Sequence, residues 1–137
     1  MLLPEGRYTI KSGDGTDRPI GLDGDRVTVL SEEDSAPEWV IEVVGSKHRI
    51  KTSDDRSVVP GDGLVWAKGD EDAKWIIESV RHHGEDNYIV KAEDGHQGWV
   101  ATNPDQQDNQ LMSRPLIVGP SWPPFFPPNE RFIMERA

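Results

Sequence analysis

Lysine and aspartate recur together along this chain at a spacing of forty residues. The segments 10–14 (IKSGD), 50–54 (IKTSD) and 90–94 (VKAED) each hold an apolar residue, a lysine, and an aspartate three positions later. A lysine beside a carboxylate could transfer protons or bind the hydroxyl groups of a sugar. Catalysis needs one asymmetric site, however, and these groups are copied three times. We therefore interpret Asp14, Asp54 and Asp94 as turn residues that accept from the backbone N–H two residues on.

The other residues that could do chemistry do not converge on a catalytic or metal site. The adjacent pair His82 and His83 lacks the i,i+2 or i,i+4 partner that a metal would need. The acidic runs 23–25 and 70–72 do not match the twelve-residue calcium loop with its terminal glutamate. No Gly-x-Ser-x-Gly nucleophile motif occurs, and the chain has no cysteine. We expect no catalytic residue, no metal, no cofactor and no enzymatic activity.

Charge and composition narrow the classes of partner. The 137 residues carry a formal net charge of −10, which argues against nucleic acid because phosphates require a basic surface. No segment approaches the roughly 20 apolar residues of a membrane span, and the first ten residues do not resemble a secretion signal. A chain without cysteine is compatible with a reducing compartment. We expect a cytoplasmic monomer with no membrane partner.

A second repeated sequence motif indicates the strands that position these residues. Segments 39–42 (WVIE), 75–78 (WIIE) and 132–135 (FIME) each follow a polar loop. Between these markers and the lysine–aspartate segments lie further short apolar runs, at 18–21, 26–30, 57–59, 64–67, 98–100 and 116–118. Runs of this length, rich in Val, Ile, Trp and Tyr and bounded by Gly, Pro, Asp and Asn, are typical of strands.

The repeat predicts an all-β fold, a β-trefoil with twelve strands in three pseudo-threefold units of about forty residues. We expect one domain over residues 1–137, with units at approximately 6–45, 46–84 and 85–137. A unit this small cannot bury its own apolar face, so the three copies must close on one another. Closure also removes most of the exposed sheet edges.

Two loops of the third unit are longer than closure of the barrel requires. Residues 101–114 separate its expected second and third strands, and residues 119–130 separate the third and fourth. The first loop is polar. The second contains five prolines among aromatic residues, so we expect it to be stiff and packed over the end of the barrel.

Several motifs resemble the mushroom (basidiomycete) serine protease inhibitors of the β-trefoil class. They are 6–10 (GRYTI), 39–42, 74–78 (KWIIE), 81–84 (RHHG), 88–91 (YIVK), 98–101 (GWVA) and, most specifically, 116–124 (LIVGPSWPP) continuing to Phe132. The likeness runs over nearly the whole chain. It implies a cytosolic protein that inhibits trypsin-like enzymes.

In that family the loop between the second and third strands of the first unit enters the protease cleft. The matching positions here are Leu22, Gly24, Asp25, Arg26 and Val27, with Arg26 as the residue that fills the specificity pocket. The segment is shorter than the family's usual loop. The sequence offers two further basic residues in loops, Lys47 and Arg56, as secondary candidates.

Two other functions are open at this point. Gln97-Gly98-Trp99 fits the Gln-x-Trp pattern of ricin-type sugar-binding repeats, and Trp66, Trp99 or Trp122 could stack on a sugar. A carbohydrate-binding lectin is therefore the alternative to a protease inhibitor. Inhibition of cysteine proteases, which other fungal trefoils achieve with different loops, is the third possibility.

Overall fold

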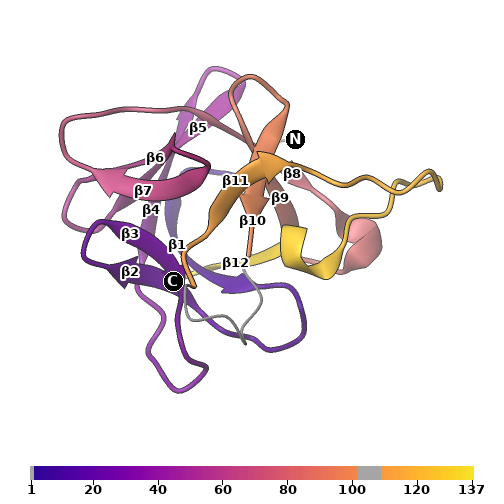
Figure 1. Cartoon of the computed structure of the whole chain (residues 1–137), viewed down its shortest axis with the longest axis horizontal. Coiled ribbons are helices and arrows are strands. Elements are labelled where there is room, and N and C mark those ends of the chain that lie inside the picture. Colours follow the sequence, from indigo (N-terminus) through magenta and orange to yellow (C-terminus); the bar gives the residue numbers. More distant parts are fainter. Residues whose placement is uncertain (1, 102–108) are drawn as a thin grey trace.

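The computed structural model describes residues 2–101 and 109–137, and in this part of the chain it contains twelve strands and two 3-10 turns (Figure 1). The all-β class predicted from the sequence is confirmed. The strands are β1 (Gly6–Ser12), β2 (Ile20–Asp23), β3 (Arg26–Val29), β4 (Trp39–Val44), β5 (Lys47–Thr52), β6 (Ser57–Gly61), β7 (Leu64–Lys68), β8 (Trp75–Ser79), β9 (Asn87–Ala92), β10 (Gln97–Val100), β11 (Met112–Pro115) and β12 (Phe132–Arg136). The 3-10 turns are η1 (Arg81–His83) and η2 (Pro128–Glu130).

Six strands close into a barrel. Antiparallel pairing runs from β1 through β4, β5, β8, β9 and β12, and β12 pairs with β1 again. The remaining strands form the hairpins β2–β3, β6–β7 and β10–β11. Pairs between β3 and β7 and between β7 and β11 join the hairpins to one another. The ring of paired strands satisfies its own backbone groups.

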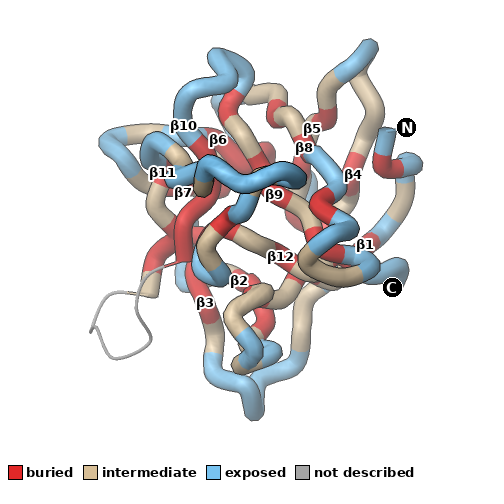
Figure 2. The backbone as a smooth tube through the Cα atoms, turned by 90° about the vertical axis from the view of Figure 1, so that its right-hand side faces the viewer, coloured by how far each residue is buried: buried red, intermediate tan, exposed pale blue. Residues whose placement is uncertain are grey.

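The core forms where alternate residues of the strands are buried (Figure 2). Trp39, Trp75 and Phe132 begin β4, β8 and β12, and all three are buried. Trp99 of β10 lies between two of them, with ring centroids 5.8 Å from Trp75 and 5.5 Å from Phe132 in edge-to-face contacts. Aromatic rings prefer this geometry because the positive edge of one meets the negative face of the other.

The turn interpretation of the repeated aspartates is confirmed at two of three positions. Asp14 accepts from the N–H of Thr16 at 3.0 Å, and Asp94 accepts from the N–H of His96 at 2.8 Å. Asp54 is different, because its carboxylate binds the hydroxyl of Thr52 and the guanidinium of Arg56. The repeat is therefore broken at Asp54.

The expected strand at 116–118 is wrong. The strand that pairs with β10 is β11, at Met112–Pro115, with Ser113 opposite Trp99. The inward side chain of this strand is the hydroxyl of Ser113, which is buried and donates to Gln97, so a search for apolar runs passes over it. Segment 116–118 instead begins the loop to β12. Half of the expected loop 101–114, residues 102–108, lies outside the described residues.

The indole N–H groups of the core tryptophans yield a test of this packing. Trp75 Nε1 donates to the Val58 carbonyl at 2.9 Å, whereas Trp99 Nε1 is buried with no partner among the described residues. Trp75→Phe and Trp99→Phe remove the same ring volume. We expect Trp75→Phe to be the more destabilising by about 1–3 kcal/mol, because it loses a bond while Trp99→Phe removes an unpaired donor. Urea denaturation of both variants measures this difference, and an equal or reversed order would contradict it.

Candidate functional site

The β2–β3 connection, which aligns with the expected inhibitory loop, is a tight turn. Asp23 pairs with Arg26 across the hairpin, so only Gly24 and Asp25 form the turn. Gly24 has a φ of 66°, in the left-handed region that glycine adopts without strain. Asp23, Gly24 and Asp25 are exposed. The turn therefore offers a partner two carboxylates and the edge of one arginine.

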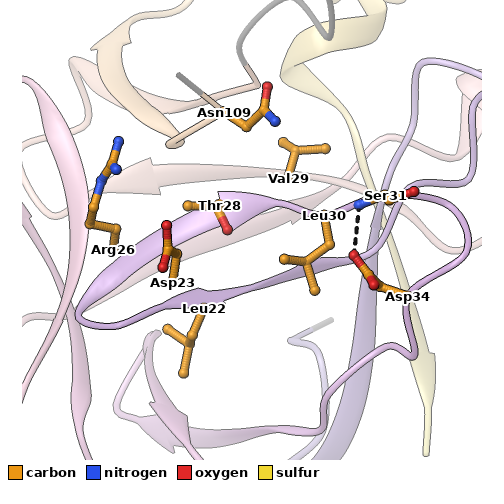
Figure 3. A pocket seen from close by; sticks show the side chains of 9 residues that line it. All are labelled: Leu22, Asp23, Arg26, Thr28, Val29, Leu30, Ser31, Asp34 and Asn109. Atoms are coloured by element: carbon orange, nitrogen blue, oxygen red, sulfur yellow. Dashed lines mark hydrogen bonds between the residues drawn. The ribbon is translucent and has the colours of Figure 1, made fainter. Parts of the chain in front are cut away.

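Two of the predicted loop residues face the interior. Val27 is fully buried in the core, and Leu22 is partly buried against it. Figure 3 shows that the Leu22 side chain points to the opposite side of the hairpin from Asp23. These apolar side chains fix the hairpin to the barrel and leave the turn itself to meet a partner.

Arg26 is half-buried at the start of β3. Its Nε donates to Gln110 Oε1 at 2.9 Å, and the buried Gln110 donates in turn to the Val65 carbonyl at 2.9 Å. Arg26 also borders an open hollow of about 410 Å³ lined by the β2–β3 hairpin, with Thr28 and Asn109 along its wall (Figure 3). The guanidinium is thus held by a side chain 84 positions away in the sequence.

Side chains and backbone from the β5–β6 connection and from β7 hold the β2–β3 turn in place. Arg56 Nη1 donates to the Gly24 carbonyl at 3.0 Å, and Lys68 Nζ lies 3.0 Å from the Asp25 carboxylate. The N–H of Ala67 donates to the Asp25 carbonyl at 2.8 Å. The hydrogen bond from Lys68 holds the pKa of Asp25 below its usual range. The turn is therefore ordered before any partner arrives.

The structure joins one of the two secondary candidates to this turn and not the other. Arg56 contacts Gly24, and its Nε is oriented by both carboxylate oxygens of Asp54 at 3.1 Å. Lys47 is the first residue of β5, just after the β4–β5 turn, and its Nζ is 3.1 Å from the carboxylate of Glu93. Arg56 thus supports the turn that carries Arg26, and Lys47 belongs to a separate surface.

A second candidate surface is the loop between β11 and β12. Residues 115–129 contain no charged side chain. Four of the five large hydrophobic side chains that the described chain exposes lie here: Ile117 at 67%, Val118 at 53%, Trp122 at 93% and Phe125 at 48%. The expected packing over the barrel holds for Phe126, which is buried with Val80 and Ile89, but not for Trp122. The loop extends from the body at the right of Figure 1.

Backbone and histidine contacts hold the base of this loop. The N–H of Gly119 donates to the Phe125 carbonyl at 2.7 Å and closes a bridge. The N–H of Phe126 donates to His83 Nε2 at 3.1 Å, and His82 Nε2 lies 2.6 Å from the Pro124 carbonyl. The histidine pair of η1 therefore has a structural role at the base of this loop.

The two histidines need different protonation at Nε2. His82 faces a carbonyl, so its Nε2 carries a hydrogen, while His83 faces an N–H, so its Nε2 carries none. Burial, together with the nearby Arg131 and His82, lowers the pKa of His83 and favours this neutral form.

A buried carboxyl group holds the start of the same loop. Glu130 Oε2 accepts from the N–H of Ile117 at 2.8 Å, and the residue is only 2% exposed. Burial raises the pKa of Glu130. Two ionisable groups thus hold the loop. Protonation of His83 destabilises the folded loop, whereas protonation of Glu130 stabilises it.

In residues 2–101 and 109–137, no three His, Cys, Asp or Glu side chains gather closely enough to hold a metal ion. The same described ranges contain no helix with the length and apolar character needed to cross a membrane.

Comparison with known proteins identifies the family. The model of the family described as peptidase inhibitor I66 matches residues 1–136. The chain belongs to this family. The predicted resemblance to mushroom protease inhibitors is confirmed, and the chain is not an enzyme.

Individual relatives match this chain over nearly its whole length. A protein of Lentinula edodes called a serine protease inhibitor is 36% identical over 140 residues, covering 95% of both chains. The structure of a proteinase inhibitor from Coprinopsis cinerea has a TM-score of 0.88 and 27% identity, covering 99% of this chain and 100% of that one. The Rhizoctonia solani agglutinin has a TM-score of 0.72 at 12% identity, covering 100% and 99%, and shares the fold.

The histidine contacts predict that the β11–β12 loop loosens in acid. Because the folded-state pKa of His83 is lowered, its contribution is complete above the unfolded value of about 6.5 and is lost as the pH falls below it. We expect amide exchange at Phe126, corrected for intrinsic rate, to accelerate between pH 7.5 and 5.5.

His83→Gln isolates this effect, because the Gln oxygen can accept the Phe126 N–H and does not titrate. Its corrected amide exchange should not accelerate as the pH falls over the same range. Glu130 acts with the opposite sign but is present in both proteins, so it cancels in the comparison. Identical pH dependence in wild type and His83→Gln would refute the assignment.

Proposed function

We propose that this chain is a β-trefoil inhibitor of trypsin-like serine proteases that acts through the β2–β3 turn. The family match supports inhibition, and the Lentinula edodes relative is called a serine protease inhibitor. The observation that carries the proposal for the site is the tethering of Gly24 and Asp25 by Arg56 and Lys68.

The trefoil proposal rests on the pairing of the strands. The proposed units 6–45, 46–84 and 85–137 each contribute two strands to the barrel and one hairpin. The paired ring of six strands and the contacts among the three hairpins are what such a fold requires.

A tethered turn suits insertion into a protease cleft. A cleft of this kind binds an extended loop by its backbone and takes one side chain into the specificity pocket. A turn that is already ordered loses little conformational entropy when it docks. Arg26 supplies the guanidinium, which can pair with the buried carboxylate of a trypsin-type pocket. Leu22 and Val27 hold the hairpin against the core during docking.

Two electrostatic features bear on this mechanism. Docking would replace the contact of Arg26 with the neutral Gln110 oxygen by an ion pair, in which both partners carry charge and the geometry can be bidentate. The adjacent Asp25 would repel an acidic pocket, but Lys68 at 3.0 Å offsets its charge. Lys68 thus supports both the turn and the proposed docking.

The sequence also supports a cytoplasmic monomer as part of this proposal. Absence of cysteine suits a reducing compartment, and a net charge of −10 opposes self-association. The Gln-x-Trp alternative loses its main support, because Trp99 is fully buried and cannot stack on a sugar. Inhibition of cysteine proteases stays a prediction, tested by adding such enzymes to the assay.

Substitution of Arg26 tests the site. We expect Arg26→Ala to weaken inhibition of trypsin by about 2–5 kcal/mol, as truncation of a central anchor does. Lys47→Ala is the matched control, since it removes a basic residue that does not contact the β2–β3 turn in the described part of the chain, and it should leave inhibition unchanged. Inhibition constants against trypsin measure both. Equal inhibition by wild type and Arg26→Ala would refute the assignment of Arg26.

A further inference from the structure

One face of the β2–β3 hairpin lines the hollow of about 410 Å³ beside the turn (Figure 3). In an antiparallel pair, residues directly opposite each other share a face, and so do alternate residues along one strand. Asp23 is paired with Arg26, so both side chains lie on the same face as Thr28 and Leu30. This alternation places two charged groups, a hydroxyl and an apolar side chain around one hollow.

The lining is rich in oxygen atoms that accept hydrogen bonds. Asp34, in the β3–β4 connection, adds a second carboxylate, which accepts from the N–H of Ser31 at 3.1 Å. Thr28 Oγ1 and Asn109 Oδ1 are buried and have no hydrogen-bond partner among the described residues. Thr28 is only 6% exposed. Unpaired buried polar groups are rare in native proteins, and a donor from outside the chain is one way in which they are satisfied.

The charge of the hollow changes when the turn docks. Among the described residues that line it, Arg26 is the one cation, and with Asp23 and Asp34 it gives the lining a formal charge of −1. When Arg26 leaves Gln110 and enters a specificity pocket, the lining that stays behind carries −2. Departure of the guanidinium and entry of another cation therefore favour each other.

We propose that the hollow receives the ammonium group of a lysine on the rim of the protease's active-site cleft, while Arg26 occupies the specificity pocket. The proposal rests on the proposed inhibition through the β2–β3 turn, because a protease that covers the turn also covers the hollow. An ammonium group has three donors and no acceptor, which suits a lining of carboxylate, hydroxyl and carboxamide oxygens. The methylene stem of the lysine can lie along Leu30, with its charged head between the carboxylates.

A lysine fits the hollow better than other occupants do. The acceptors come from β2, β3 and the β3–β4 connection, and a compact ammonium with rotatable donors reaches separate acceptors more readily than a planar guanidinium. An acidic side chain would be repelled by both carboxylates. The net charge of −10 also steers the chain toward basic surfaces.

Substitution of Asp34 tests the hollow. We expect Asp34→Asn to weaken inhibition of trypsin about fivefold, mainly through faster dissociation, because the ion pair is covered in the complex. The Asn oxygen can still accept the Ser31 N–H, so the loop is preserved. Glu33→Gln is the matched control: it removes the same charge from the neighbouring exposed residue, which does not line the hollow, and it should leave the dissociation rate unchanged. Surface plasmon resonance measures the rates.

Thr28→Val removes the unpaired hydroxyl and keeps the shape of the side chain. We expect inhibition of trypsin to weaken about threefold, because the ammonium loses an acceptor, while the melting temperature of the free protein stays equal or rises. Unchanged inhibition by this variant would contradict the contact.

Acetylation of the lysines of trypsin tests the identity of the occupant, since it removes their charge. The wild type should inhibit acetylated trypsin less strongly than unmodified trypsin. Asp34→Asn should then inhibit the acetylated enzyme as well as the wild type does, as in a double-mutant cycle. Arg26→Ala should still weaken inhibition of the acetylated enzyme, because the carboxylate of the specificity pocket is unmodified.

The outcomes separate this proposal from the proposed function. Equal dissociation rates of Asp34→Asn and Glu33→Gln from trypsin refute the hollow as a binding site and leave the role of Arg26 intact. An Asp34→Asn effect that persists on acetylated trypsin overturns a lysine as the occupant. An effect of Asp34→Asn without an effect of Arg26→Ala retains the hollow and removes Arg26 from the site. A wild type that does not inhibit trypsin overturns both proposals.

Discussion

Burial of one large aromatic side chain at the start of each of β4, β8 and β12 is the interaction on which the structure depends. Trp39, Trp75 and Phe132 are each at most 1% exposed and belong to one common cluster. A buried aromatic removes about 150–250 Å² from water, which at about 25 cal/mol per Å² contributes about 4–6 kcal/mol each as an upper bound. No single hairpin could enclose them, so the six barrel strands must close together.

A barrel stabilised in this way leaves its loops free to differ. At Asp14 and Asp94 the carboxylate accepts from the backbone N–H two residues on. At Asp54 the carboxylate binds the guanidinium of Arg56 instead. Arg56 can then reach the Gly24 carbonyl in another hairpin. The break in the repeat therefore coincides with the support of the candidate inhibitory turn, which is where an asymmetric function has to arise on a repeated frame.

Most of the strands could be predicted from the sequence, but few of the contacts at the candidate site could. Strands that carry apolar side chains on alternate positions were predictable, and so was the family, because both depend on local pattern. β11 was not, since its inward residue is Ser113. The contact of Arg26 with Gln110 joins residues 84 positions apart, and only the closed fold brings them together. Composition likewise marked an aromatic loop at 119–130 but could not tell that Phe126 is buried and Trp122 exposed.

The two candidate loops are stiffened by different forces, and this difference has consequences for their behaviour. The β2–β3 turn depends on Lys68 and Arg56, whose contacts lie at the surface and are weakened by salt, since the screening length is about 10 Å at 0.1 M. The β11–β12 loop depends on the Gly119 bridge and on His83, a neutral acceptor, and salt barely affects either. Ionic strength should therefore act mainly on the charged turn and pH mainly on the apolar loop. One barrel thus carries two exposed loops that respond to different solution conditions.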